Sequence, residues 1–256
     1  MVRGLYTAAT GMNVQAKKMD IISNDLANVN TTGYKKDTAV VGSFPQILAS
    51  RLNDVQNHVP NNGVIGGMSL GARIEEIYTN FTQGSVIKTD GMVDLAIQGE
   101  GFFAVQTPTD MLYTRDGNFS INQAGEMVTK EGYYVLSQEG QPITFGEEFL
   151  SNGGQVVVKE GGEVYRGAEF VDTIALVRFE DNGTLQKADN NLYRSEEQAL
   201  PFQGSVLQGF LESSNVNPVT AMVDMITVSR AYEANQKVIQ TQDSLLGKAV
   251  NEVGRA

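Results

Sequence analysis

Few residues of this 256-residue sequence could do chemistry, and those that could are poorly placed for it. Cysteine is absent, which excludes a disulfide framework, a thiolate metal site and a cysteine nucleophile. The single histidine, His58, leaves a histidine-based metal site without enough ligands, and the neighbouring Pro60 and Asn61 indicate an exposed loop. The residue types therefore disfavour most familiar enzyme chemistries.

Two patterns resemble ligand sites without meeting their requirements. Asp116, Asn118 and Glu126 suggest a calcium loop, but the glycine and the acidic twelfth residue of such a loop are missing, so a hairpin turn is the simpler prediction. The glycines between Gly63 and Gly71 lack the Lys-Ser/Thr pair of a phosphate loop. We therefore predict no catalytic residue, no metal site and no cofactor.

The net charge of −11, from 19 basic and 30 acidic residues, is unevenly distributed. Residues 1–36 carry five basic and two acidic residues, a net charge of +3, and residues 219–256 carry four of each sign. Residues 37–218 therefore hold a net charge of −14. Such acidity repels a phosphate backbone, so nucleic acid is not expected as a partner. Near-neutral ends can pack densely, and an acidic middle is most simply a solvated surface.

The sequence shows neither a membrane span nor a secretion leader. No stretch approaches the roughly 20 consecutive apolar residues that cross a bilayer, so no membrane insertion is expected. Polar residues interrupt the apolar positions of the first 20 residues, so no cleaved signal peptide is expected. The residues alone leave the location open, because a protein without disulfides can also work outside the reducing cytosol.

The C-terminal segment predicts a long helix from Pro218 to about Gly254. Asn217 suits the N-cap, and proline suits the first helical position. Apolar residues form a strict seven-residue stripe at Met225, Tyr232, Ile239, Leu246 and Val253. The stripe is flanked by Met222, Val228, Val238 and Leu245. Five consecutive heptads predict a face that packs against other helices.

The N-terminal segment predicts a second, shorter amphipathic helix. Its stripe repeats every seven residues at Leu5, Met12, Met19 and Leu26. The helix should end near Asn28, because the asparagines, threonines and glycine that follow favour turns.

Between the two helices the pattern changes to strands and turns. Alternation at 93–98, 103–105 and 156–158 and an apolar run at 174–179 predict strands. Asp-Gly, Asn-Gly and Gly-Gly pairs punctuate them, which favours antiparallel hairpins. One short helix is also predicted, from Pro45 to Gln56, with one apolar side formed by Ile47, Leu48, Leu52 and Val55.

The predicted fold class is α+β, with long N- and C-terminal helices forming a coiled-coil stem and a central, mostly antiparallel β domain. The corresponding segments are 1–36, 37–210 and 211–256. A helix over 218–253 would be about 54 Å long, whereas the central β domain should be roughly 40 Å broad. The C-terminal helix is therefore expected to extend beyond the β domain. Two explanations stay open: a two-helix hairpin leaning on the β domain, or stripes completed by neighbouring copies in a helical filament.

Four stretches of the sequence carry a resemblance to a known family. They are SNDLANVNTTGYKK at 23–36, VDLAIQGEGFFAV at 93–105, YTRDGNFSINQAGEMVTKEGYYV at 113–135, and ESSNVNPVTAMVDMITVSRAYEANQKVIQTQDSLL at 212–246. In this order they resemble the bacterial flagellar rod and hook axial proteins. The length of the chain is similar to that of the rod proteins of the FlgF/FlgG type, proximal or distal.

The resemblance implies a structural subunit of the flagellar basal-body rod, not an enzyme, that self-assembles into a helical tube and transmits torque from motor to hook. It implies, as partners, copies of the chain, other rod and hook axial proteins and the flagellar export apparatus. It also implies an extracytoplasmic place in the basal body, reached without a cleaved signal peptide.

On this interpretation the two helical stripes make the assembly contacts. A family-signature turn, at Asn24, Asn28, Thr32 and Gly33, returns the chain toward the outer domain. Two alternatives remain: a β-rich binding module dimerised through its terminal helices, and a β-rich wall hydrolase that uses the same export route.

Overall fold

A computed structural model shows that the chain forms two compact units. Unit 1 comprises residues 1–26, 37–78 and 218–256, and unit 2 comprises residues 27–36 and 79–217. The chain therefore passes between the units four times. The residues that the structure describes are 2–50, 55–56, 59–60, 64–146, 149, 154–188 and 191–253.

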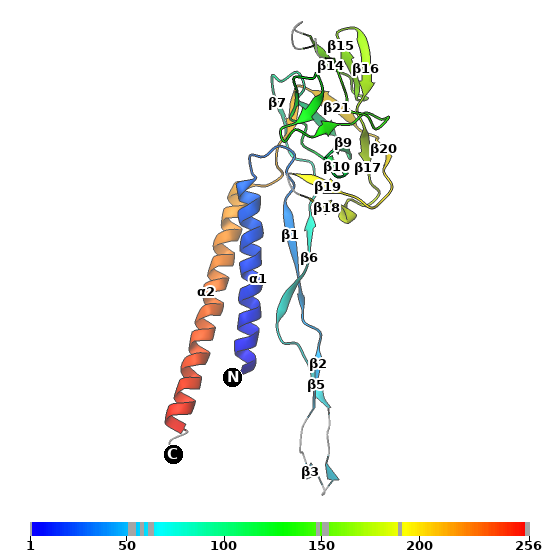
Figure 1. Cartoon of the computed structure of the whole chain (residues 1–256). Coiled ribbons are helices and arrows are strands. Elements are labelled where there is room, and N and C mark those ends of the chain that lie inside the picture. The colour runs from blue at the N-terminus through cyan, green and yellow to red at the C-terminus, as the bar shows by residue number, and fades with distance from the viewer. Residues whose placement is uncertain are drawn as a thin grey trace. The chain divides into compact units, whose positions relative to one another are not determined.

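Two long helices dominate unit 1. They are α1 (Val2–Ala27) and α2 (Pro218–Lys248), and a π-helical stretch, η2 (Ala249–Val253), continues the second. The helices run antiparallel and side by side, with the start of α1 and the end of α2 at the same end of the pair (Figure 1). The predicted boundaries are confirmed, since α1 stops just before Asn28 and proline opens α2. With 31 residues, α2 is about 47 Å long.

The rest of unit 1 is a two-stranded ribbon that continues through three successive strand pairs. β1 (Asp37–Ser43) pairs with β6 (Ala72–Thr79), β2 (Ile47–Ser50) with β5 (Val64–Met68), and β3 (Val55–Gln56) with β4 (Val59–Pro60).

The short helix predicted from Pro45 to Gln56 is wrong. Ile47 and Leu48 lie in β2 and Val55 lies in β3, while Leu52 is outside the described residues. The segment forms a strand because it pairs with a strand about twenty residues later in the chain. Ile47 lies opposite Met68, and this antiparallel ladder satisfies the backbone hydrogen bonds of β2.

Unit 2 is centred on a nine-stranded sheet in which β9 (Phe102–Gln106) is the middle strand. One edge of β9 pairs with β10, and the other pairs with β13 and β17, all antiparallel. The other strands of this sheet are β10 (Met111–Thr114), β11 (Phe119–Ile121), β12 (Met127–Thr129), β13 (Tyr134–Val135), β17 (Leu176–Arg178), β18 (Gln186–Lys187), β19 (Leu192–Arg194) and β20 (Leu200–Pro201).

Three smaller sheets complete unit 2. One has three strands: β14 (Val156–Val158), β15 (Glu163–Arg166) and β16 (Glu169–Thr173). Two are strand pairs: β8 (Leu95–Gln98) with β21 (Ser205–Gln208), and β7 (Val86–Lys88) with β22 (Phe210–Glu212). A 3-10 turn, η1, covers Asn182–Thr184.

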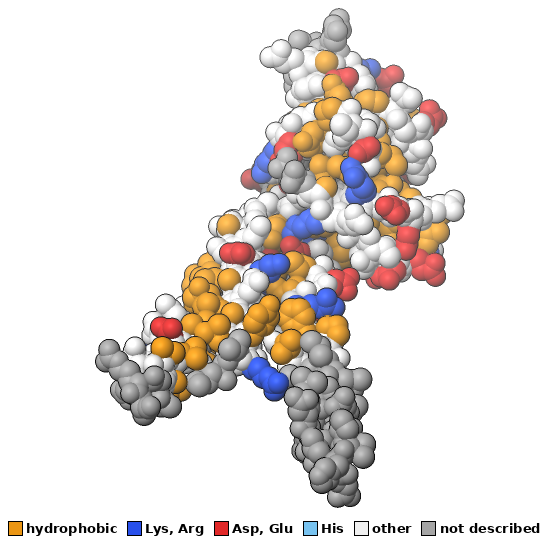
Figure 2. Space-filling model, turned by 60° about the horizontal axis from the view of Figure 1, so that its bottom comes forward, with side chains coloured by type: hydrophobic (Ala, Val, Ile, Leu, Met, Phe, Trp, Pro, Cys, Tyr) orange, Lys and Arg blue, Asp and Glu red, His pale blue; other side chains and the backbone are white. Residues whose placement is uncertain are grey.

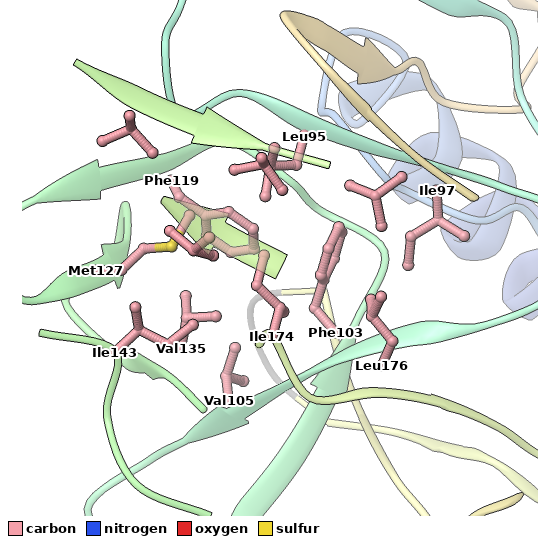
Figure 3. Packing of buried hydrophobic residues seen from close by; sticks show 14 of the residues in the cluster. Leu95, Ile97, Phe103, Val105, Phe119, Met127, Val135, Ile143, Ile174 and Leu176 are labelled. Carbon is pink, nitrogen blue, oxygen red and sulfur yellow. The ribbon is translucent and has the colours of Figure 1, made fainter. Parts of the chain in front are cut away.

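The core of unit 2 lies on both faces of the central strand. Successive side chains of a strand point to opposite faces, so Phe103 and Val105 face one hydrophobic cluster and Phe102 and Ala104 face a second. Figure 3 shows the first cluster, in which Phe103 packs among side chains from several strands. Both clusters are fully inside unit 2, so this unit has a complete hydrophobic interior.

The sequence located four of these strands and underestimated the burial of one of them. The predicted strands at 93–98, 103–105, 156–158 and 174–179 correspond to β8, β9, β14 and β17. Simple alternation would leave Ala96 on an exposed face, but Leu95, Ala96 and Ile97 are all buried. Consecutive buried residues indicate that β8 is covered on both faces. The fold is α+β.

Candidate functional site

The predicted stripe of α2 lies on the less exposed side of that helix. Met225, Tyr232, Ile239 and Leu246 are half-buried, and Val253 lies in η2, where its side chain is outside the described ones. The spacing of alternately three and four residues also includes the buried Ala221 and Val228 and the half-buried Asn235 and Gln242. This is the seam spacing of paired helices.

Glycines of α1 meet amides of α2 where the helices approach each other. A Cβ atom built on Gly4 would lie 2.9 Å from Nε2 of Gln242, and one built on Gly11 would lie 3.3 Å from Nδ2 of Asn235. The two pairs are seven residues apart on each helix, so they match in one antiparallel register. Sequence reasoning missed these glycines. The seven-residue spacing of Gly4 and Gly11 is the only feature of the sequence that could have indicated a helix contact.

The predicted stripe of α1 is half-buried along its whole length. Leu5, Met12, Met19 and Leu26 each retain part of their surface. The residues of α1 that are buried are others, namely Ala8, Val14 and Asp25. On another side of α1, Thr10 touches the ribbon, because a Cβ on Gly71 would collide with its hydroxyl. Unit 1 therefore covers its N-terminal stripe only in part.

Further apolar side chains of the C-terminal helix are exposed, and we call them together the open face. They are Val219, Met222, Val223 and Ile226 in the first turns of α2, Val238 and Leu245 farther along α2 and closer to its stripe, and Val250 in η2, with exposures between 45% and 70%. The predicted flanking residues Met222, Val238 and Leu245 belong to it, whereas Val228 is buried. Hydrophobic side chains gather over the helical part of unit 1 in Figure 2, with only scattered charges among them. Several large apolar side chains exposed along one helix are suited to contact with another protein.

The ribbon of unit 1 also exposes apolar side chains. Val40 and Val41 on β1 and Ile77 and Tyr78 on β6 are exposed. Neighbouring residues of a strand point to opposite faces, so the ribbon exposes apolar groups on both sides. Isolated two-stranded ribbons are only marginally stable in water, so these groups are suited to contact with another protein.

The predicted signature turn is anchored within unit 2. Gly33 has a φ angle of +67°, and a Cβ atom there would lie 2.4 Å from the backbone nitrogen of Asp116. Glycine is therefore needed both for the backbone conformation and for the close approach. The Thr32 hydroxyl donates a 2.6 Å hydrogen bond to Asp116 Oδ1, and Asn191 Nδ2 donates one of 3.1 Å to the Thr32 carbonyl.

The two asparagines of the predicted turn lie earlier in the chain. Asn28 directly follows α1, where its carbonyl accepts a hydrogen bond from the Thr31 backbone and its side chain accepts one from the Thr31 hydroxyl. Asn24 is an exposed residue within α1. The turn therefore consists of residues 28–33, and of the four predicted residues Thr32 and Gly33 contact the same segment of unit 2.

Asp116 is the titratable group of this turn. Burial raises the pKa of its carboxyl, while hydrogen bonds from Thr32 and from the Asn118 backbone act in the opposite direction. Asp116 lies between β10 and β11, which do not pair with each other, so the hairpin turn predicted at Asp116 and Asn118 is wrong. The hairpin is the next turn, between the paired strands β11 and β12. Glu126 likewise bonds to Asn122 within its own turn, through contacts of 2.8 and 2.9 Å.

Other candidate chemical sites have structural roles or lie outside the described residues. Gly66 and Gly67 are part of strand β5, and His58 is not among the described residues. Within the described ranges, no group of three or more histidines and carboxylates could hold a metal ion. None of the helices described combines the length and the apolar character needed to cross a membrane.

Three family descriptions match successive parts of the chain. Residues 5–35 match "Flagella basal body rod protein", residues 96–186 match "Flagellar hook protein FlgE/F/G D1 domain", and residues 207–252 match "Flagellar basal body rod FlgEFG protein C-terminal". The first and third contain the two terminal stripes, apart from Val253 in the last, and the first also contains the turn.

Characterised relatives match over nearly the full length. The flagellar basal-body rod protein FlgF of Caulobacter vibrioides is 36% identical, with 100% of this chain and 99% of the relative covered. The flagellar basal-body rod protein FlgG of Borreliella burgdorferi is also 36% identical, with 98% of each covered. The flagellar hook-basal body complex protein FlhO of Bacillus subtilis is 33% identical, with 100% of each covered.

Proposed function

The chain belongs to the flagellar basal-body rod protein family, and we propose that it assembles by burying the open face of α2 against neighbouring copies. It is a structural subunit of the rod and not an enzyme. The proposed product of assembly is a helical tube that transmits torque from motor to hook.

The observation that carries this proposal is the contrast between the two sides of α2. Asn235 and Gln242 meet α1, whereas the residues of the open face keep 45–70% of their surface exposed in the single chain. Each large apolar side chain that becomes buried contributes about 1.5–3 kcal/mol. The sum along the helix favours association of copies over a lone subunit in water.

We propose that the two stripes form a coiled-coil stem. Their residues are Leu5, Met12, Met19 and Leu26 on α1, with Met225, Tyr232, Ile239, Leu246 and Val253 on the C-terminal helix. Seam spacing and partial burial support contacts both with the other helix of the same copy and with helices of the next copies.

As functional segments, we propose residues 1–36 and 211–256 as the stem and residues 37–210 as the outer part of the subunit. Asn28, Thr32 and Gly33 form the turn that joins the two, and Asn24 lies just before it in the last turn of α1. Support comes from the contacts of Thr32 and Gly33 with Asp116, which fix the end of this turn within unit 2.

We propose as partners the other axial proteins of the rod and hook, in addition to copies of this chain. The proposed route is the flagellar export apparatus, to a place in the basal body outside the cytoplasm. Family membership supports both points. Mass spectrometry of the subunit from isolated basal bodies tests the route: the mass of the whole chain is expected, and a shortened N-terminus would contradict uncleaved export.

The function is tested by complementing a deletion strain. Wild-type protein should restore swimming and appear in isolated hook-basal bodies. Leu245→Asp, which places a charge on the open face, should restore neither, while the purified variant keeps the unfolding transition of unit 2. The matched control is Ser244→Asp, which adds the same charge to the exposed neighbouring residue without removing an apolar group. Normal swimming with Leu245→Asp would contradict the proposed use of the open face.

A further inference from the structure

Three buried charges meet in unit 2, where the chain enters and leaves that unit. Lys35 Nζ lies 2.5 Å from Glu212 Oε1, and Arg115 Nη1 lies 3.4 Å from Glu212 Oε2. The side chains of Lys35 and Glu212 have no exposed surface, and that of Arg115 keeps 2%. Taking ions out of water is costly unless pairing and hydrogen bonds compensate, so such a cluster is not expected as passive filling.

Backbone groups satisfy most of the remaining hydrogen-bonding capacity of the Lys35–Glu212 pair. Lys35 Nζ donates a 2.9 Å hydrogen bond to the Thr82 carbonyl, and the Gly84 N–H donates one of 2.8 Å to Glu212 Oε1. Burial lowers the pKa of Lys35, Arg115 lowers it further, and Glu212 opposes both. The carboxylate is therefore the group that holds two cations together in this interior.

Arg115 connects this pair to the body of unit 2. Its Nη2 donates a 2.9 Å hydrogen bond to the Gly99 carbonyl, and its guanidinium lies 5.2 Å from the centre of the Phe102 ring. Phe102 begins the central strand β9 and belongs to the hydrophobic core. Through Arg115, the charge cluster contacts the central strand β9.

Direct bonds also join the two segments that precede the exits of the chain from unit 2, 33–36 and 212–215. The Gly33 N–H donates a 2.8 Å hydrogen bond to the Glu212 carbonyl, and the Lys36 N–H donates one of 2.8 Å to Asn215 Oδ1. Asn215 Nδ2 in turn donates a 2.8 Å hydrogen bond to the Asn80 carbonyl. Three stretches far apart in sequence, 33–36, 80–84 and 212–215, are therefore bonded together at one place.

These three stretches coincide with passages of the chain between the two units. The passages occur after residues 26, 36, 78 and 217, and each of the last three lies within two residues of one of the three stretches. These passages are the covalent links through which force on the helices or the ribbon can reach unit 2. The cluster is therefore placed where such force arrives.

Starting from the rod function proposed above, we propose that Lys35, Glu212 and Arg115 form a clasp that carries force between segments 33–36 and 212–215, which precede the two points where the chain leaves unit 2. The three are positioning residues: they hold the chain passages together and to β9 while torque acts on the subunit. Without the clasp, the same force would act on the strand pairs near the passages, such as β7 with β22.

Force spectroscopy on the purified full chain tests the clasp. Because the chain has no cysteine, two introduced cysteines provide unique handles. One pair, at the exposed residues Asn30 and Val219, pulls across the clasp. A second pair, at the exposed residues Met111 and Phe170, pulls through the body of unit 2. Lys35→Met removes one cation and leaves Arg115 and Glu212 as a one-to-one pair.

At constant force, Lys35→Met is expected to rupture about tenfold faster than wild type across 30–219, because a charged hydrogen bond is lost. Across 111–170 its rate should stay unchanged. Lys159→Met, which removes an exposed lysine bonded to Tyr165, should change neither rate. Equal acceleration along both directions would overturn the proposal, because the cluster would then stabilise the unit as a whole. Unchanged rupture across 30–219 would overturn it as well.

Lys35→Gln provides a second variant if Lys35→Met does not fold, since its amide can still donate to the Thr82 carbonyl. The same directional difference is expected for it. The measurement uses the isolated chain, so its result does not depend on assembly into a rod. Failure of the proposed rod function would appear in the swimming assay with Leu245→Asp and would leave the rupture rates as they are.

Discussion

The two units bury apolar side chains to different extents. In unit 2, Phe102, Phe103 and Val105 of the central strand have no exposed surface. In α2 of unit 1, only Ala221 and Val228 are buried, and six large apolar residues of α2 together with Val250 of η2 are exposed as the open face. Both units come from one chain of ordinary composition, so the difference is a property of their sequences. Unit 2 is complete as a single copy, and unit 1 requires further surface from other molecules.

This difference separates stability from function. A subunit that must polymerise needs a part that folds by itself and a part whose folding is completed by neighbours. Substitutions in the interior of unit 2 should therefore change the free energy of unfolding, and substitutions on the helices of unit 1 should change assembly. Each of the following experiments tests one side of this contrast.

The largest expected effect is on the interior of unit 2. Phe103→Ala should lower the free energy of unfolding of this unit by about 3–5 kcal/mol, because a large buried ring is lost. Urea unfolding followed by circular dichroism measures it. Phe170→Ala, at a ring that is 55% exposed, is the matched control and should cost less than about 0.5 kcal/mol. Equal effects of the two substitutions would refute the assignment of the core.

The next effect is on the helical stripe. Ile239→Asp should abolish rod assembly, because it replaces apolar contacts worth about 1.5–3 kcal/mol per side chain with a charge at a half-buried position. The unfolding transition of unit 2 should remain as in wild type. Electron microscopy of basal bodies reads out assembly, and Gln240→Asp, at the exposed next residue, serves as the control. An intact rod containing Ile239→Asp would show that the stripe of α2 does not make the assembly contacts.

A smaller effect is expected at the contact between the helices. Gly11→Leu should destabilise the helix pair by about 1–3 kcal/mol through overpacking against Asn235, although leucine is the better helix former. Thermal loss of helical circular dichroism measures it. Ala9→Leu, on the exposed side of α1, should cause no loss. Adding Asn235→Ala to Gly11→Leu should restore part of the stability of the helix pair. If the stability does not recover, Gly11 does not pack against Asn235.

The smallest effect concerns Asp116. Because burial raises the pKa of its carboxyl, the protonated form is favoured in the folded state. Its contribution to stability is therefore present below the unfolded pKa and is lost as the pH rises through the folded pKa. Asp116→Asn should remove this pH dependence and stabilise unit 2 at neutral pH by less than about 1 kcal/mol, since asparagine still accepts from Thr32 and Asn118. Unfolding curves from pH 3 to 7 should show a steeper decline for wild type than for the variant; parallel curves would contradict the assignment.

The sequence predicted the features that depend on neighbouring residues. Pro218 and the turn residues after Asn28 define helix ends through their own backbone preferences, and the structure has both helix boundaries at these places. The heptad stripe of α2 also follows from spacing alone. The sequence patterns therefore located the two long helices and four of the strands, and the family resemblance gave the chain its class of function.

The features that the sequence did not reveal depend on residues far apart in the chain. Ile47 looked helical because its partner Met68 lies beyond any local window. Lys35 and Glu212 are separated by 177 positions, so nothing in either segment indicates a buried ion pair. The role of Gly11 was missed because it depends on the contact with Asn235 of the other helix.

The central claim is that the open face of α2 is covered by copies of the same chain, and sedimentation velocity over a wide range of concentration tests it most directly. Wild-type protein is expected to grow without a defined end as concentration rises, while Leu245→Asp remains a monomer with the same folded unit 2. A dimer whose size is independent of concentration, and which Leu245→Asp leaves intact, would contradict the account.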